Sequence, residues 1–201
     1  QFNGNTHLVP TVVDTDNYHP ISKASGNKIC IGWSGSFSTI PYYEMALPAL
    51  MKIKAKYGDS VCFKVISDRH YSNKDLDVQG VIWTSTKEVE ELSEIDIGIM
   101  PLPDDEWTKG KCALKGLLYM SMGQVAVLSP VGVNRALIED GVNGFLADTN
   151  EEWVDKLSLL IENSALREKM GEKGRETVVN QYSVRAHKDN FVRFFDECNP
   201  K

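Results

Sequence analysis

Short apolar runs alternate with longer amphipathic stretches along most of this chain. Six of the runs have the apolar content of buried strands, and they cover Ile29–Trp33, Val61–Ile66, Gly80–Trp83, Asp96–Met100, Val125–Leu128 and Gly144–Leu146. Strands that alternate with helices are typical of a parallel sheet with helices on both faces. The pattern therefore predicts an α/β fold: a Rossmann-like, doubly wound parallel sheet of about six strands flanked by helices, in the common order 3-2-1-4-5-6.

Helical periodicity fills the spaces between these strands and continues after the last one. The predicted helices are Tyr42–Tyr57, a short helix from Ser85 with a capping box to Glu88, Lys111–Met122, Asn134–Ile138, Asn150–Glu162, Ala165–Asn180 and Val184–Cys198. Pro48 lies inside the first of them, where proline costs about 3 kcal/mol, so that helix should kink or begin late. Thr149 and Ser164 are the expected N-caps of two C-terminal helices.

Length and composition suit one globular α/β domain. The chain has 201 residues, of which 42% are hydrophobic and 25% are charged. The first stretch contains Pro10 and Pro20 and little periodic pattern, which indicates an extended connector. We therefore expect a linker over residues 1–20, a domain over residues 21–182 and a C-terminal helix over residues 183–201.

Charge and cysteine usage exclude several classes of protein. The formal net charge of -6 argues against general nucleic-acid binding, so an anionic ligand must be held by a local cluster of lysines. The four cysteines form no CxxC pair and the four histidines are scattered, so we expect no metal site, no metal cofactor and no disulfide framework. No apolar run approaches the roughly 18 residues of a membrane span. A reducing, cytoplasmic location is expected.

Three lysines follow the fourth predicted strand, around the expected start of a helix: Lys109, Lys111 and Lys115. Helix N-termini carry a partial positive charge, so lysines are unfavourable there unless an anion joins them. A diphosphate would be such an anion, because Lys111 and Lys115 share one helical face and Gly110 allows close approach of backbone. The alternative is a solvent-exposed face balanced by the acidic residues 104–106.

Five longer motifs occur in order along the second half of the chain. They are Asp96-Ile-Gly-Ile-Met-Pro-Leu-Pro103, Lys109-Gly-Lys-Cys-Ala-Leu-Lys115, Tyr119-Met-Ser-Met-Gly123, Ser129-Pro-Val-Gly-Val133 and Asp140-Gly-Val-Asn-Gly144. Together they resemble the C-terminal, donor-binding lobe of GT-B glycosyltransferases of family 4 (group 1). Val9–Asp14 is similar to the interdomain linker of that family, and Ile31–Ser36 to the first strand and loop of the donor lobe.

The resemblance implies an enzyme that transfers a hexosyl group from a nucleotide sugar with retention and without a metal. It also implies a glycan or lipid-linked acceptor, held by an N-terminal lobe that this chain lacks, as in polysaccharide or glycoconjugate synthesis. Lys111 and Lys115 would act in catalysis by stabilising the charge on the leaving diphosphate. The isolated domain should then be inactive, and the full-length protein could associate peripherally with the inner face of a membrane.

Loops at the carboxyl ends of strands one and four, residues 34–39 and 101–110, should line the ligand crevice. Gly35, Ser36 and Thr39 could donate hydrogen bonds to a pyrophosphate or form an ordinary turn and helix cap.

Further candidates follow the other strands. Trp83 and Thr84 could meet the nucleobase, although a tryptophan there is more often part of a core. Ser67, with Asp68, could line the same crevice or form a turn. Val131 and Gly132 could face the donor sugar through backbone N–H groups.

One departure from the family pattern affects the predicted function. Members typically carry two glutamates eight positions apart, beside the donor sugar and the ribose, and these positions fall on Gly110 and Leu118. Neither side chain can accept a hydrogen bond. Glu106 or Glu139 could bind the ribose instead, or the nucleotide is held differently.

Two other functions stay open. A non-catalytic nucleotide-binding module of the same fold would explain the missing glutamates. A nicotinamide-dependent (NAD) dehydrogenase domain is less favoured, because Gly32-Trp-Ser-Gly35 lacks a third glycine and no acid follows about 20 residues later.

The apolar side chains of the last predicted helix are Val184, Phe191, Val192, Phe194 and Phe195. In the resembled family this helix returns to the N-terminal lobe. We therefore expect it to be only loosely packed in this chain.

Overall fold

The computed structural model describes residues 9–22 and 28–198. In this part of the chain, strands form one sheet: β1 (Ile29–Ser34), β2 (Val61–Ser67), β3 (Gln79–Ile82), β4 (Ile97–Met100), β5 (Val125–Leu128) and β6 (Phe145–Leu146). Their order is β3-β2-β1-β4-β5-β6 and every pair is parallel. The predicted fold and strand order are confirmed.

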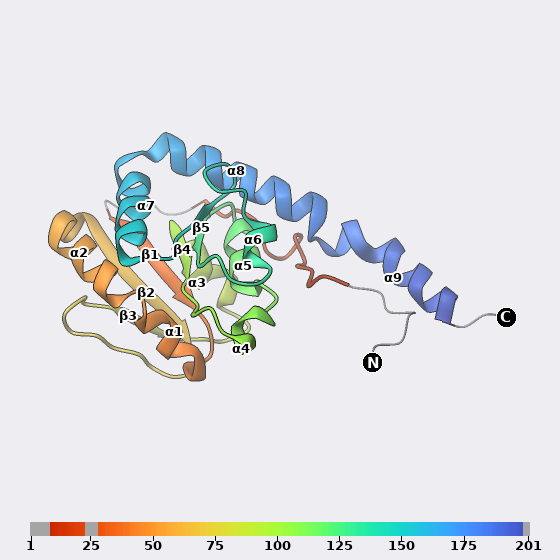
Figure 1. Ribbon diagram of the computed structural model, residues 1–201, viewed down its shortest axis with the longest axis horizontal. Coiled ribbons are helices and arrows are strands. Elements are labelled where there is room, and N and C mark those ends of the chain that lie inside the picture. The colour runs from red at the N-terminus through yellow and green to blue at the C-terminus, as the bar shows by residue number, and fades with distance from the viewer. Residues whose placement is uncertain (1–8, 23–27, 199–201) are drawn as a thin grey trace.

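Helices cover both faces of the sheet (Figure 1). They are α1 (Ile40–Glu44), α2 (Leu47–Tyr57), α3 (Glu88–Ser93), α4 (Glu106–Lys109), α5 (Leu114–Ser121), α6 (Asn134–Leu137), α7 (Asn150–Glu162), α8 (Ser164–Gln181) and α9 (Val184–Cys198). No helix within residues 9–22 and 28–198 combines the length and apolarity needed to cross a membrane.

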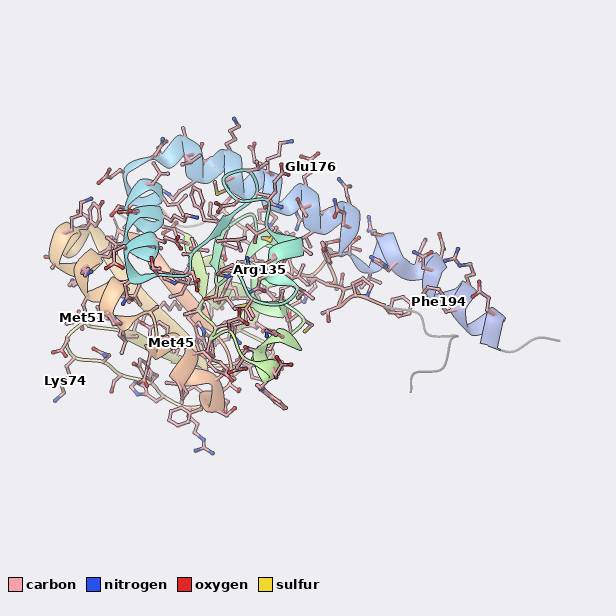
Figure 2. All side chains as sticks on the ribbon, viewed as in Figure 1. Met45, Met51, Lys74, Arg135, Glu176 and Phe194 are labelled. Atoms are coloured by element: carbon pink, nitrogen blue, oxygen red, sulfur yellow. The ribbon has the colours of Figure 1, made fainter. Side chains whose placement is uncertain are left out.

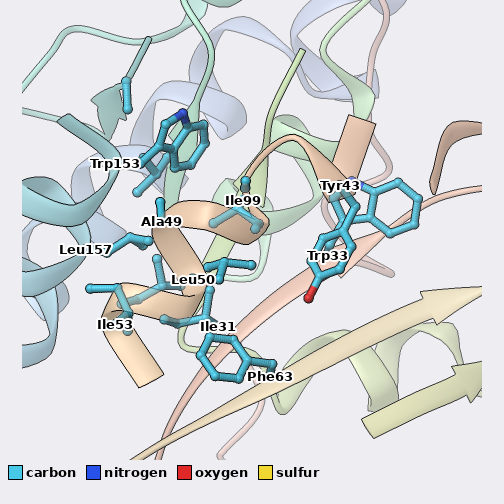
Figure 3. Packing of buried hydrophobic residues seen from close by; sticks show 14 of the residues in the cluster. Ile31, Trp33, Tyr43, Ala49, Leu50, Ile53, Phe63, Ile99, Trp153 and Leu157 are labelled. Atoms are coloured by element: carbon cyan, nitrogen blue, oxygen red, sulfur yellow. The ribbon is translucent and has the colours of Figure 1, made fainter. Parts of the chain in front are cut away.

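One core cluster lies between the sheet and helices α2 and α7. Figure 3 shows Leu50 and Ile53 of α2 beside Ile31 and Phe63, which come from the adjacent strands β1 and β2. Leu157 of α7 belongs to the same cluster and is fully buried. Burial of side chains of this size contributes about 1.5–3 kcal/mol each, so this face fixes both helices against the sheet.

A second cluster covers the opposite face. Leu117 of α5 and Val178 of α8 pack there with Ala126 and Leu128 of β5. Ala126 and Leu128 belong to this cluster whereas Val127 belongs to the first one, because successive side chains of a strand point to opposite faces. The sheet is therefore buried on both sides, which is usual for parallel sheets.

The predicted helix Tyr42–Tyr57 is divided into α1 and α2. Pro48 lies in the first turn of α2, where its missing N–H removes no helical hydrogen bond. Pro41 has the equivalent place in α1. The expectation that Pro48 forces a late start is confirmed.

Two of the predicted caps were wrong. α3 begins at Glu88 rather than Ser85, and its N-cap residue, Lys87, makes no side-chain capping hydrogen bond. α8 is capped by Asn163 rather than Ser164, because the Asn163 carboxamide oxygen accepts a hydrogen bond from the Leu166 N–H. The cap at Thr149 is confirmed.

The predicted helix Lys111–Met122 was wrong at its N-terminus. The short helix α4 comes first, closed by a capping box between Asp105 and Thr108. α5 then begins only at Leu114, because Ala113 has a left-handed backbone with φ of 58°. Lys109 therefore ends one helix, and of the three lysines only Lys115 lies in the first turn of α5.

Helix α9 extends away from the sheet (Figure 1). Val184 and Val192 are exposed, Phe191 is half-buried, and Phe194 lies far from the sheet (Figure 2). The expected loose packing is confirmed for these side chains, whereas the side chain of Phe195 is outside the described part.

The predicted linker is only partly described, because residues 1–8 lie outside the described part. Its described portion is anchored to the domain by a parallel bridge between Val13 and Ser183.

A close approach at Gly98 joins the sheet to α5. A Cβ atom at Gly98 would lie 2.2 Å from the Tyr119 ring, so only glycine allows the ring to lie there. The Tyr119 side chain is fully buried, and its hydroxyl oxygen accepts a 2.8 Å hydrogen bond from the Ser34 N–H. Gly98 thereby permits α5 to reach the end of β1.

We expect Gly98→Ala to lower the free energy of unfolding by about 1–3 kcal/mol, because the Tyr119 ring would have to move. Denaturant-induced unfolding measures this loss. Gly110→Ala is the control, since its Cβ would meet only the Trp107 carbonyl oxygen at 3.4 Å. Equal stabilities of the two variants would contradict the proposed packing.

Candidate functional site

A pocket of about 480 Å³ opens at the carboxyl ends of β1 and β4. It is lined by Ser34, Gly35, Ser36, Asp68, Trp83, Glu88, Met100, Gly110, Lys111, Cys112, Ala113, Leu114, Lys115 and Leu118. The strand order reverses between β1 and β4, and open α/β sheets bind their ligands at this point. The expected sharing of one crevice by the loops after these two strands is confirmed.

The loop after β1 is fixed from two sides. The Asp68 carboxylate accepts a hydrogen bond from the Phe37 N–H, and this bond is the main cause that lowers the pKa of Asp68. On the other side, a Cβ at Gly35 would lie 2.5 Å from Cε of Lys115. A glycine at this position therefore lets the lysine side chain cross the loop.

Lys115 is a desolvated cation that has no counter-ion among the described residues. Its Nζ lies 5.2 Å from the centroid of the Trp33 ring, and no carboxylate of the described residues forms an ion pair with it. Burial, and to a smaller extent the positive charge of Lys111, lower the pKa of Lys115 from 10.5 to about 8. A bound anion would relieve both effects.

Lys111 is the second cation of the pocket. Its Nζ lies 5.1 Å from the centroid of the Tyr42 ring, and within residues 9–22 and 28–198 it too forms no ion pair with a carboxylate. Lys111 and Lys115 make this wall of the pocket positive although the whole chain is acidic, while the carboxylates of Asp68 and Glu88 also line the pocket.

Lys109 is in a different environment. Its Nζ is 3.0 Å from an oxygen of Glu106 and 3.5 Å from an oxygen of Asp104, and it does not line the pocket. The solvent-exposed alternative considered for the three lysines thus describes Lys109. That Lys109 contacts a diphosphate remains a prediction, and the ion pairs argue against it because they already compensate the charge of Lys109.

The backbone before α5 is strained at the pocket. Ala113 adopts a left-handed conformation that costs a residue other than glycine about 1–3 kcal/mol, and such residues cluster at functional sites. Ala113 and Leu114 line the pocket where α5 begins, and the first N–H groups of a helix lack partners within it. This is a suitable place for an anion.

The pocket also brings together Gly35, Ser36, Trp83 and Gly110 from the predicted set. Trp83 is 41% exposed, so the alternative of a core residue was wrong.

Five other predicted residues do not line the pocket. The Thr39 hydroxyl donates to the Ser36 carbonyl oxygen, and Thr84 lies beside Thr86. Ser67 is completely buried.

Val131 and Gly132 are the remaining two. Val131 is 3% exposed, and Gly132 approaches the backbone of Lys109 so closely that a Cβ would lie 2.6 Å from its carbonyl oxygen. Gly132 therefore lies against the end of α4, whereas Val131 belongs to the second core cluster.

Glu88 is a charged pocket residue that the sequence interpretation did not assign to the site. It was assigned to a capping box, but its Oε2 accepts a 2.7 Å hydrogen bond from the Tyr18 hydroxyl. Only the tertiary structure brings this carboxylate to the pocket. Glu106 and Glu139, the two residues considered for the ribose, do not line the pocket. In the described part of the chain, no three His, Cys, Asp or Glu residues are grouped to hold a metal ion.

A pocket with two lysines at the switch point of a parallel α/β sheet is an arrangement suited to phosphorylated ligands. Residues 28–163 match the sequence profile of the family described as glycosyl transferases group 1. The chain belongs to this family. A search of curated protein sequences found no significant match.

Several solved structures share the fold. The C-terminal domain of the group 1 protein LpcC from Francisella tularensis is 20% identical with a TM-score of 0.68, over 86% of this chain and 99% of that domain. Sucrose-phosphate synthase from Thermosynechococcus elongatus is 14% identical with a TM-score of 0.75, over 98% of this chain and 53% of that one. HepE from Anabaena, in complex with UDP and glucose, is 14% identical with a TM-score of 0.72, over 92% of this chain and 55% of HepE. This chain thus spans about half the length of the last two.

The lowered pKa of Lys115 predicts a pH-dependent stability. Below pH 8 the folded state carries the cost of the desolvated charge, and between about 8 and 10.5 it loses its proton before the unfolded state does. The free energy of unfolding should therefore rise with pH across this range.

Lys115→Met should be more stable than the wild type at pH 7, by on the order of 2 kcal/mol, with a difference that vanishes above about pH 10.5. Urea unfolding at several pH values measures the difference. Lys52→Met is the control, because Lys52 forms only an exposed pair with Glu151 and should change stability by less than about 1 kcal/mol. A pH-independent effect of Lys115→Met would contradict the assigned environment.

Proposed function

We propose that this chain is the donor-binding domain of a nucleotide-sugar-dependent glycosyltransferase. The observation that carries the proposal is the pair of lysines, Lys111 and Lys115, that share a pocket at the switch point of the sheet without a carboxylate partner among the described residues. A diphosphate has the charge and the hydrogen-bond acceptors that this pair lacks. Family membership supports the class of reaction.

Both lysines would act on the leaving group. When the bond from the sugar carbon to the diphosphate oxygen breaks, negative charge develops on that oxygen, and cations already in place stabilise it. Binding of the diphosphate would also return the pKa of Lys115 towards its ordinary value, so that the lysine stays protonated during transfer. We therefore expect transfer without a metal cofactor.

The sugar transferred is proposed to be a hexose, with retention at the anomeric carbon. Crystal structures of HepE contain UDP with glucose or UDP-glucose, which supports a nucleotide-sugar donor here. For the acceptor we propose a glycan or a lipid-linked molecule. We propose that the full-length protein acts in the cytoplasm and associates peripherally with a membrane.

A second lobe would supply the acceptor. The chain spans 53% of sucrose-phosphate synthase and 55% of HepE, so those proteins contain a further part of similar size. Transfer requires the acceptor to be held in line with the donor carbon, which is worth several kcal/mol of positioning.

Residues 1–201 alone should therefore bind a nucleoside diphosphate and transfer no sugar. A transfer assay with radiolabelled UDP-glucose compares the chain with the full-length protein. Transfer by the chain alone would show that the acceptor site lies within it.

A non-catalytic nucleotide-binding module is the second candidate. It is favoured by the residues at the two positions where the family typically has glutamates: Gly110 lines the pocket without a side chain, and Leu118 is a buried apolar residue. This candidate predicts nucleotide binding with neither transfer nor hydrolysis by the full-length protein.

The lysine assignment predicts a ranked loss of affinity. Lys111→Met should weaken binding of UDP by about tenfold or more, because a charge-assisted hydrogen bond contributes roughly 1.5–3 kcal/mol. Uridine should be affected far less, and calorimetry measures both.

Lys109→Met is the matched comparison, since Lys109 is two residues away but is engaged with Glu106 and Asp104. The Lys109→Met variant should lose less than about threefold in affinity for UDP, because an exposed ion pair contributes little. Equal losses for UDP and uridine in Lys111→Met would assign Lys111 to the fold rather than to the phosphate.

A further inference from the structure

A nucleoside diphosphate presents three kinds of chemistry to a pocket. The diphosphate needs cations, the base offers an aromatic face, and the ribose carries two vicinal hydroxyl groups that donate hydrogen bonds. The lysines account for the first. The hydroxyl groups require acceptors, and a carboxylate is the side chain that accepts most strongly.

Two carboxylate side chains line the pocket, those of Asp68 and Glu88. Asp68 holds the loop after β1 through its Oδ1, which accepts hydrogen bonds from the Phe37 N–H and the Ser67 hydroxyl, while its Oδ2 accepts none among the described residues. Glu88 is half-buried, and its Oε2 accepts one hydrogen bond, from the Tyr18 hydroxyl. Among the described residues its Oε1 accepts none, so this oxygen is available to a ligand.

Trp83 and Glu88 are linked by the short connection from β3 to α3. Trp83 is exposed and lines the same pocket as Glu88. Bases stack on aromatic side chains with a gain of about 1–3 kcal/mol each. A base on Trp83 would leave its ribose close to this connection, because the two are directly bonded in a nucleoside.

Tyr18 is well suited to orient the carboxylate. Burial, together with the neighbouring Glu88, raises the pKa of Tyr18 to about 12, so at neutral pH the hydroxyl stays protonated and donates a hydrogen bond to Glu88. The backbone of Tyr18 is also anchored, since Arg175 donates a 2.9 Å hydrogen bond to its carbonyl oxygen. Arg175 donates to the Ser121 carbonyl oxygen as well, at the end of α5.

We propose that Glu88 accepts hydrogen bonds from the ribose hydroxyl groups of the nucleotide, and that Tyr18 is a positioning residue that orients the Glu88 carboxylate. The inference rests on the proposed function, because it concerns the same pocket. It assigns to α3 a ribose contact that Gly110 and Leu118 cannot make through their side chains. It also connects the pocket to the segment of residues 9–22.

The experiment compares ribose with a sugar that lacks its hydroxyl groups. Calorimetry on the full-length protein first identifies which of UDP, GDP and ADP binds most tightly, and then measures the 2′,3′-dideoxy form of that nucleotide. The wild type should bind the ribose form about 10–100-fold more tightly, as hydrogen bonds to a charged group imply.

Glu88→Ala should abolish this preference and leave the affinity for the dideoxy form within about twofold. Glu88→Gln keeps one acceptor oxygen and should retain part of the preference. Tyr18→Phe should reduce the preference several-fold without changing the dideoxy affinity, because the carboxylate remains but is no longer oriented. Glu90→Ala is the control, since Glu90 is an exposed residue of the same helix that does not line the pocket.

Inorganic pyrophosphate reports on each variant separately. Its affinity should be the same in the wild type and in the Glu88 and Tyr18 variants, which shows that they fold and that the lysines are in place. Equal loss of the ribose and dideoxy forms in both Glu88 variants would overturn the ribose assignment and leave the proposed function intact. Failure of the wild type to bind any of the three nucleotides or pyrophosphate would overturn the proposed function as well.

Discussion

The pocket depends on how closely helix α5 approaches the sheet. Gly98 lets the Tyr119 ring lie against β4, and the Tyr119 hydroxyl then accepts a hydrogen bond from Ser34 at the end of β1. One turn earlier in α5, Lys115 crosses the loop after β1 because Gly35 has no side chain. Two glycines, Gly98 in β4 and Gly35 just after β1, therefore determine where the cation lies. A larger side chain at Gly98 would displace the Tyr119 ring of α5, and one at Gly35 would displace the Lys115 side chain.

Three lysines that are close in sequence have different electrostatic environments. Lys109 has carboxylate neighbours and is half-exposed, so its charge is already compensated. Lys115 has lost water and has no such neighbour among the described residues, and the charge of Lys111 adds to its cost. A site that is unfavourable for a cation without a ligand is favourable for an anionic ligand, because binding removes the cost. This is the physical basis for assigning the pocket to a diphosphate.

Two predicted helix N-termini were wrong, because the local sequence pattern competes there with contacts in the folded structure. Ser85 and Glu88 have the spacing of a capping box, yet the helix begins at Glu88 and its carboxylate accepts a hydrogen bond from Tyr18, 70 residues away in the sequence. The lysines suggested one helix from Lys111, whereas Ala113 adopts a left-handed backbone that delays it. In each case tertiary contacts outweigh a local preference of about 1 kcal/mol.

The sequence by itself determined the sheet, its parallel order and the two loops that meet at its switch point, because hydrophobic periodicity reports which residues are buried and strand alternation restricts the topology. It also identified Lys111 and Lys115. Only the tertiary structure decided that Lys109 is compensated, that Trp83 is exposed to the pocket and that Glu88 reaches it beside Tyr18. Those outcomes depend on distances between residues remote in sequence, and desolvation and ion pairing are set by such distances rather than by residue spacing.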